Sequence, residues 1–399
     1  MLTNNEKNYY RYSSCWYFME TANAYFLPWL IVYLGSGIMN RTSDAFSMFY
    51  ISIVIGIIVA GFISHIVSAK KLAVFGFLML SASVVSLSFN LSSTLSILNV
   101  YVYSVLFGFG TGFIKPTLDS IIPDISVGRI KNLTINTTTL NYFFGLTGSL
   151  LSYILISDST KTYLSIALVL CVMGLIFLSL IPEKVNLVST KPKYKKVMLE
   201  ALREITINKT ILLMSITYFM IGLCSMAVFI GGVALHVKEL ENSNDFYIAG
   251  MQIAWSLGGL VTGFFFLRKL KITNHSFFYV IGWFICGCGV ILFGLAQSPH
   301  VCLVAGVLWG AGTSIGFSMT RLIIQNNTED RYKGAIFSSF ILISFLGAAV
   351  GAKMLTVLSD IYSAGIAVAI DGTIFSVVTI CLFQMLRAAE NTNLQRTLK

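Results

Sequence analysis

Long apolar runs, separated by short polar segments, dominate the pattern of this chain. A helix needs about 20 apolar residues to cross the roughly 30 Å hydrocarbon core of a bilayer. Twelve stretches meet this requirement, which predicts an all-α membrane protein with twelve transmembrane helices. The predicted spans are 13–36, 45–66, 72–91, 97–118, 134–156, 162–182, 210–235, 246–267, 276–297, 301–323, 335–357 and 362–386.

One connecting segment, 183–209, is longer than the others, polar and rich in lysine. It divides the predicted spans into two sets of six. The expected domains are therefore an N-terminal six-helix bundle at 1–182, a cytoplasmic linker at 183–209 and a C-terminal six-helix bundle at 210–399.

The second half repeats the first at an offset of 202 residues. The sequence Leu-Phe-Gly-Phe-Gly-Thr at 106–111 returns as Leu-Trp-Gly-Ala-Gly-Thr at 308–313. Further glycines match at the same offset: Gly56 with Gly258, Gly61 with Gly263, and Gly145 with Gly347. Two parallel repeats of six spans predict pseudo-symmetric bundles related by an axis along the membrane normal, with a cavity between them.

Composition supports the membrane reading, because a chain with 56% hydrophobic residues and a mean hydropathy of +0.80 has too little polar surface for a soluble exterior. The basic residues behind the net charge of +10 are concentrated on one side of the predicted topology. Of the 27 basic residues, the other side holds only Arg41, Lys161, Lys238 and Lys353. Basic loops favour the cytoplasm. We expect a multi-pass protein of the bacterial inner membrane with both termini cytoplasmic, and no nucleic-acid partner.

With these features the chain resembles transporters of the major facilitator superfamily, and the resemblance covers nearly its whole length. After the second span the family's Gly-x-x-x-Asp motif reads Gly61 to His65, followed by Lys70 and Lys71. The fourth span carries the family's glycines, Gly108 and Gly110. The drug-antiporter pattern of the fifth span is represented by the sequence at 145–148. The resemblance implies alternating access, and specifically export of drug-like compounds.

Glu20 is the clearest candidate for chemistry, because it lies about 12 Å into the first predicted span at 1.5 Å per residue. An intramembrane carboxylate normally faces a cavity or a partner. Acids in the first helix of the superfamily's drug exporters often couple substrate to protons. We therefore expect proton coupling by Glu20 and Asn23, with a structural hydrogen bond as the alternative. Asp371 and Lys353 could pair as a structural bridge, which we favour over a functional role for them.

The resemblance also implies which helices line a substrate cavity. An aromatic cavity with few charges suits an amphipathic compound, although most aromatic residues of such a chain simply pack. The candidates are Trp16, Tyr17, Tyr101, Tyr103, Lys115, Asn136, Asn141, Tyr142, Tyr218, Gln252, Trp255, Trp309, Thr313 and Ser314.

A cytoplasmic gate is predicted from charges at the helix ends. Asp119 and Arg321 align at the repeat offset, and His65 and Lys70 lie beneath the second and third spans. Solvated charges that only set topology are the alternative for these residues.

The leading hypothesis is proton-coupled efflux of an amphipathic, drug-like or antimicrobial compound, with peptide and nucleotide-like antibiotics included. Uptake or facilitated diffusion of a sugar, nucleoside or similar nutrient is the alternative. No HExxH, GxSxG or GxxxxGK[ST] motif occurs, so an enzyme or an ATP-driven pump has no support. No cofactor and no metal is expected, and the partners are a small-molecule substrate, protons and lipid, with the protein as a monomer.

Overall fold

The computed structural model describes residues 3–34, 39–63, 67–90, 97–125, 130–182, 203–240, 245–266, 274–327 and 330–397. These residues form helices and contain no strand. A backbone inside lipid must satisfy its own hydrogen bonds, and a helix does so within one segment. Nine segments of the described chain are long and apolar enough to cross a membrane. The predicted all-α membrane fold is confirmed, while the count of twelve spans stays a prediction.

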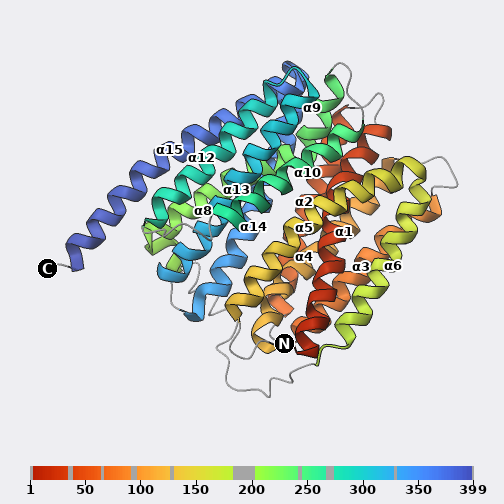
Figure 1. Ribbon diagram of the computed structural model, residues 1–399, viewed down its shortest axis with the longest axis horizontal. Helices are drawn as coiled ribbons and strands as arrows, with labels where there is room; N and C mark the ends of the chain where they lie inside the picture. Colours follow the sequence, from red (N-terminus) through yellow and green to blue (C-terminus); the bar gives the residue numbers. More distant parts are fainter. Residues whose placement is uncertain are drawn as a thin grey trace. The chain divides into compact units, whose positions relative to one another are not determined.

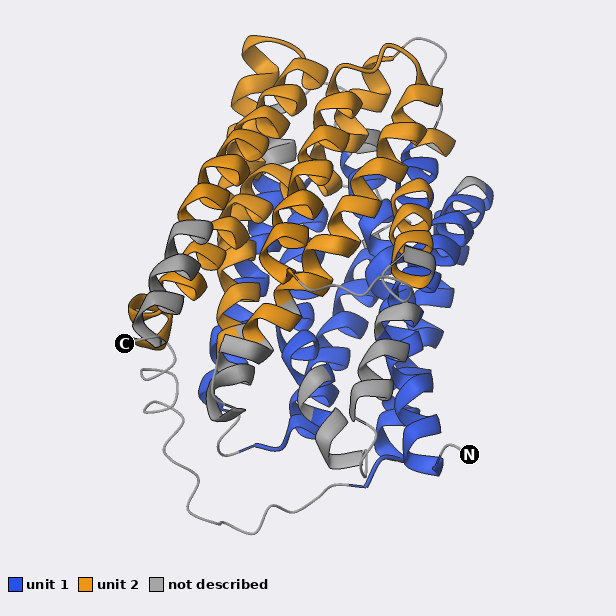
Figure 2. Cartoon of the chain, turned by 60° about the vertical axis from the view of Figure 1, so that its left-hand side comes forward, with its two compact units in different colours: residues 1–194, 248–253 blue, residues 195–247, 254–399 orange. Residues whose placement is uncertain are grey.

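The chain divides into two compact units, which Figure 2 distinguishes by colour. Unit 1 comprises residues 1–194 and 248–253, and unit 2 comprises residues 195–247 and 254–399. The predicted linker, 183–209, lies largely outside the described residues. The predicted domain boundaries therefore stay a prediction.

In unit 1, α4 packs against α2 and α3, while α1 packs against α5 and α6. Figure 1 shows these helices in red to yellow-green. Their bounds are α1 Asn4–Leu34, α2 Met39–Ile63, α3 Ala69–Asn90, α4 Ile97–Ile125, α5 Ile130–Asp158 and α6 Thr160–Ser179.

Helix α1 begins well before the apolar run that predicted it. Thr3 and Glu6 form a reciprocal capping box: the Glu6 amide donates to Thr3 Oγ1 at 3.2 Å, and the Thr3 amide donates to Glu6 Oε2 at 2.7 Å. This arrangement satisfies two amide donors that a helix start otherwise leaves unpaired. Hydropathy cannot detect such a polar first turn, so α1 extends beyond the predicted span at its N-terminal end.

In unit 2, α12 packs against α13 and α15, and α14 packs against α8. The span from Lys209 to Glu239, here called helix seven, contains two π-helical segments, η1 and η2. The bounds are α8 Lys209–Ile221, η1 Gly222–Met226, η2 Val228–Gly232, α9 Val233–Glu239, α10 Asp245–Val261, η3 Thr262–Phe266, α12 His275–Gly294, α13 Pro299–Asn327, α14 Asp330–Ile361 and α15 Ala364–Thr397.

Two glycines of α4 allow their neighbours to approach closely. A Cβ added at Gly108 would collide with the carbonyl oxygen of Phe49 on α2. A Cβ added at Gly110 would lie 2.7 Å from the carbonyl oxygen of Gly76 on α3. Without a hydrophobic effect between helices in lipid, such small residues provide the close contact that holds the bundle together.

The matching glycines of α13 do the same in unit 2. A Cβ at Gly310 would meet the carbonyl oxygen of Trp255 on α10, and one at Gly312 would lie 2.6 Å from the carbonyl oxygen of Gly282 on α12. In each unit the first glycine of the pair contacts one neighbouring helix and the second contacts the other. The sequence repeat therefore corresponds to a repeated mode of helix packing.

Candidate functional site

An ion pair joins α1 to α4. Lys115 Nζ lies 2.5 Å from Glu20 Oε1, and the two side chains are 24% and 26% exposed, respectively. The attraction between opposite charges is stronger where water is scarce, and each charge lowers the cost of placing the other inside a membrane. Because about a quarter of each side chain is exposed, the pair is not fully enclosed within unit 1.

One turn further along α1, Asn23 makes a second contact with α4. The hydroxyl of Tyr103 donates a hydrogen bond to Asn23 Oδ1 at 2.7 Å. Both residues are buried, with 3% and 1% exposure, respectively. A buried polar pair of this kind fixes the register of two helices, because breaking it leaves unpaired groups in an apolar environment.

Pro28 explains a third polar contact. It lies inside α1 and has no backbone N–H, so the carbonyl of Ala24 loses its normal donor within the helix. Gln252, in the segment 248–253 that belongs to unit 1, donates from Nε2 to this carbonyl at 2.5 Å. Its Oε1 accepts a hydrogen bond from Ser149 Oγ of α5 at 2.8 Å. The buried Gln252 side chain therefore replaces a hydrogen bond that proline removed.

Glu20, Asn23 and the carbonyl of Ala24 thus form a polar face along α1. Of the other cavity residues predicted in unit 1, Trp16 is fully buried, and its Nε1 has no hydrogen-bond partner in the described chain. Partly buried positions are held by Tyr17, Tyr101, Asn141 and Tyr142, and the side chain of Asn136 lies outside the described residues. Their role as cavity residues stays a prediction.

Unit 2 has an aromatic cluster around Trp309. The indole Nε1 of Trp309 donates to Ser225 Oγ of η1 at 3.0 Å. The ring of Phe229 lies 5.6 Å from that of Trp309 and 4.9 Å from that of Trp255. Sequence analysis missed Ser225 and Phe229 because it selected aromatic and amide residues one at a time.

Thr313 and Tyr218 occupy other surroundings in unit 2. Thr313 Oγ1 donates to the carbonyl of Trp309 at 2.8 Å and lies 3.7 Å from the Cys286 sulfur. The Tyr218 ring packs 4.9 Å from that of Phe340 and 5.9 Å from that of Phe317. Tyr218 is thus a member of a packed aromatic cluster.

Among the predicted gate residues, Lys70 has described contacts. Its Nζ donates to the carbonyls of Ser179 and Ile181 at 2.8 Å and 2.5 Å, respectively. The ammonium group of Lys70, which belongs to α3, thus lies at the C-terminal end of α6. There it satisfies carbonyls that lack helical donors and interacts favourably with the helix dipole. His65 and the side chains of Asp119 and Arg321 lie outside the described residues, so the gate stays a prediction.

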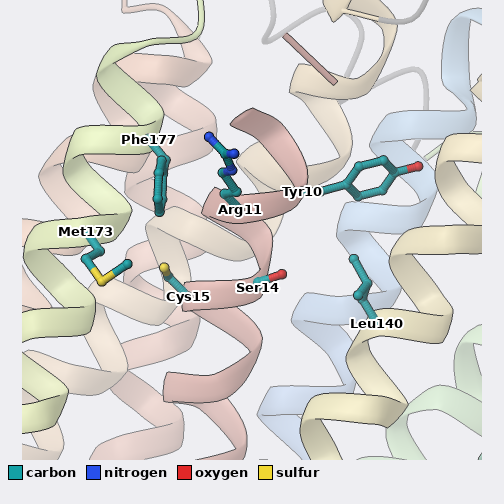
Figure 3. Close-up of a pocket in the computed structure, with 7 residues that line it drawn as sticks. All are labelled: Tyr10, Arg11, Ser14, Cys15, Leu140, Met173 and Phe177. Carbon is teal, nitrogen blue, oxygen red and sulfur yellow. The ribbon is translucent and has the colours of Figure 1, made fainter. Parts of the chain in front are cut away.

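A separate open groove of about 600 Å³ lies on unit 1 between α1, α5 and α6. Its lining residues are Tyr10, Arg11, Ser14, Cys15, Leu140, Met173 and Phe177 (Figure 3). The Arg11 guanidinium lies 5.6 Å from the centre of the Phe177 ring. The cavity residues predicted from sequence are not part of this lining. Within the described part of the chain, no three His, Cys, Asp or Glu residues are grouped so as to hold a metal ion.

Comparison with known proteins assigns the chain to a protein family. The model of the Major Facilitator Superfamily matches residues 13–352. This chain belongs to the Major Facilitator Superfamily. It is a multi-pass membrane protein and a transporter, so the expectation of a transporter in place of an enzyme is confirmed at superfamily level. No curated protein sequence gives a match.

Solved structures of superfamily transporters share the fold. A POT family transporter in complex with a thioalcohol-conjugated peptide has a TM-score of 0.73 at 13% identity, covering 97% of this chain and 96% of that one. The human organic anion transporter MFSD10 (TETRAN) has a TM-score of 0.72 at 12% identity, covering 96% and 99%. The nucleoside transporter NupG has a TM-score of 0.68 at 11% identity, also covering 96% and 99%. At these identities the likeness concerns the fold.

Proposed function

We propose that this transporter couples proton movement to the export of an amphipathic, drug-like or antimicrobial compound by alternating access, and that the Glu20–Lys115 pair carries the coupling. The supporting observation is the pair itself, formed between α1 and α4 with about a quarter of each side chain exposed. The proposal includes twelve spans in two bundles at 1–182 and 210–399, a cytoplasmic linker at 183–209, and cytoplasmic termini. The protein would act as a monomer in a bacterial inner membrane.

The coupling step is the transfer of a proton from hydronium to the Glu20 carboxylate, which leaves a neutral carboxyl group and a water molecule. The neutral carboxyl attracts the Lys115 ammonium less strongly, so less of this positive charge in a membrane helix is compensated. Such a charge is costly unless it gains water or another anion. Protonation therefore favours a conformation in which Lys115 is better hydrated, while the buried hydrogen bond from Tyr103 to Asn23 keeps α1 joined to α4.

An amphipathic substrate is proposed because the described aromatic groups of unit 2 are large and uncharged. The Phe229 ring lies 4.9 Å from the Trp255 ring and 5.6 Å from the Trp309 ring. Flat aromatic faces bind apolar and cationic compounds with little loss of conformational entropy. Direction and substrate follow from the resemblance to drug exporters and are part of the proposal.

Uptake of a small nutrient, such as a sugar or nucleoside, is a second candidate. Within this class the ion pair favours a zwitterion, because Glu20 could receive an ammonium group and Lys115 a carboxylate. POT family transporters of the same fold have been solved in complex with a thioalcohol-conjugated peptide and with 5-aminolevulinic acid, which are amino-acid-like compounds. The nucleoside transporter NupG shares the fold as well.

The deciding experiment uses proteoliposomes with an imposed pH gradient and compares wild type with Glu20→Gln. For proton-coupled export, substrate should accumulate on the more acidic side, and Glu20→Gln should abolish the effect of the gradient. Accumulation of an amino-acid-like compound on the opposite side would select the uptake candidate. If substrate moves equally with and without the gradient in both proteins, proton coupling through Glu20 is wrong.

A further inference from the structure

Asp371 is an acidic residue that the proposed function does not use. It lies on α15 in unit 2 and is fully buried, with 0% exposure. Neither carboxylate oxygen has a hydrogen-bond partner in the part of the chain that the structure describes. The expected pair with Lys353 is not formed, and Lys353 is exposed on α14.

The segment around Asp371 packs against the π-helical part of helix seven. Helix α15 contacts both η1 and η2. Val368, one turn from Asp371, lies 3.0 Å from the position that a Cβ of Gly232 would occupy. π-helical segments are rare and occur most often at functional sites. The buried carboxyl therefore faces an irregular stretch of a membrane helix.

No described residue supplies a cation to this carboxyl. The buried thiol of Cys224 on η1 interacts electrostatically with Asp371. The described basic residues on elements packed against α15 form no hydrogen bond to Asp371. They are Lys209 on α8, His236 and Lys238 on α9, His275 on α12 and Lys353 on α14. The acidic and other titratable groups on these elements are Tyr218, Glu239, Tyr279, Cys286, Cys288 and Asp360. Glu239 accepts hydrogen bonds from the amide of Ala364 at 3.0 Å and 3.1 Å.

An ionised carboxylate without a partner in an apolar interior is so costly that it takes up a proton instead. We propose that Asp371 is a proton-binding site of unit 2, separate from Glu20. Hydronium transfers its proton to one Asp371 oxygen, leaving a neutral carboxyl group and a water molecule. Loss of this proton creates a buried anion, which requires water or a displacement of α15 from helix seven.

The first test is thermal unfolding of the purified protein between about pH 5 and about pH 9. A group that favours its protonated form in the folded state stabilises the fold at low pH, and this stability is lost as pH rises. Wild type and Asp371→Asn should therefore unfold at similar temperatures at low pH. At high pH the wild type should unfold at least about 2 °C below Asp371→Asn, which cannot ionise.

Asp360→Asn is the matched control, because Asp360 is exposed near the end of α14. Its pH profile should parallel that of wild type. The inference is overturned if the Asp371→Asn and wild-type curves also remain parallel over the whole range.

Carbodiimide labelling of the wild-type protein tests the same inference without a variant. An apolar carbodiimide reacts with a protonated carboxyl in the membrane, and peptide mass spectrometry locates the adduct. Labelling of Asp371 should be strong at low pH and fall several-fold as pH rises. Labelling that is equal at both pH extremes, or an adduct absent from Asp371 at low pH, would count against the site. Neither readout depends on transport, so failure of the proposed export leaves this inference standing.

Discussion

The two units use the same glycine contacts but place different residues at the repeat-related positions. At the offset of 202 residues, Glu20 corresponds to Gly222 and Lys115 to Phe317. Gly222 packs against the carbonyl of Ser344, and Phe317 packs 5.0 Å from the Trp283 ring. Where unit 1 has an ion pair, unit 2 therefore has packing contacts. The repeat preserves the scaffold, while the charges that carry the proposed chemistry belong to one half.

The reverse holds for the proposed proton site. Asp371 corresponds to Val169, which is exposed on α6. Unit 1 thus carries a paired acid near its polar face, and unit 2 carries an unpaired acid beside a π-helical segment.

The largest expected effect comes from filling the glycine contact that both units share. Gly310→Val would drive a side chain into the backbone carbonyl of Trp255, which cannot move aside. We expect a loss of about 3 kcal/mol in the free energy of unfolding, the upper end for overpacking. Gly108→Val, against the carbonyl of Phe49, should cost a similar amount, as measured by thermal unfolding in detergent.

Gly263→Ala is the control for this prediction, because its added Cβ meets only the Ser314 hydroxyl, at 3.3 Å. It should leave stability nearly unchanged. If one of the two valine variants proves harmless, the idea of a shared scaffold fails.

A second prediction concerns the Glu20–Lys115 pair, whose repeat-related positions in unit 2 are the uncharged Gly222 and Phe317. Lys115→Met leaves Glu20 without its partner, and we expect transport to fall on the order of 100-fold, about 2.7 kcal/mol. Phe317→Met, at the corresponding position of unit 2, should keep transport within about tenfold of wild type. Initial rates in proteoliposomes provide the measurement. Equal losses in the two variants would show that position, and not charge, matters.

The third prediction tests how each unit handles a break in its first helix. Pro28 corresponds to Ile230 of η2, so unit 1 has a proline where unit 2 has a π-helical segment. Gln252→Leu would leave the Ala24 carbonyl unpaired, which should destabilise the protein by about 1–3 kcal/mol. In a Pro28→Ala background the helix regains its own donor, and the same change should cost about 1 kcal/mol less. Additive losses would refute this account of Gln252.

Sequence reasoning predicted the fold well because its main signals are physical requirements of a bilayer. Span length, the glycines at the repeat offset and the apolar composition each follow from lipid as solvent. The early start of α1 was not found, because a polar capping turn at Thr3 and Glu6 has no hydropathy signal.

Within the site, Glu20 and Lys115 were each selected, but under separate roles. Their pairing depends on how α1 and α4 face each other, which a single sequence does not specify. Pro28 offered a usable signal. A proline inside a helix leaves the carbonyl four residues earlier without its helical donor, which predicts that another residue donates a hydrogen bond to it. The repeat offset offered a second signal, because Ser225 corresponds to the selected residue Asn23.

This last correspondence gives the smallest and most specific prediction. Asn23 joins α1 to α4 through Tyr103, and Ser225 joins helix seven to α13 through Trp309. Each unit therefore links its first and fourth repeat helices by one buried hydrogen bond. Tyr103→Phe and Ser225→Ala each remove one partner and leave the other unsatisfied. Each should therefore cost about 1 kcal/mol of stability, near the typical net value of a hydrogen bond. If the bonds serve only to join helices, both variants should lower the unfolding temperature and spare transport. A transport defect confined to Tyr103→Phe would mean that the bond beside the ion pair also positions Glu20, and that the asymmetry between the units extends beyond their charges.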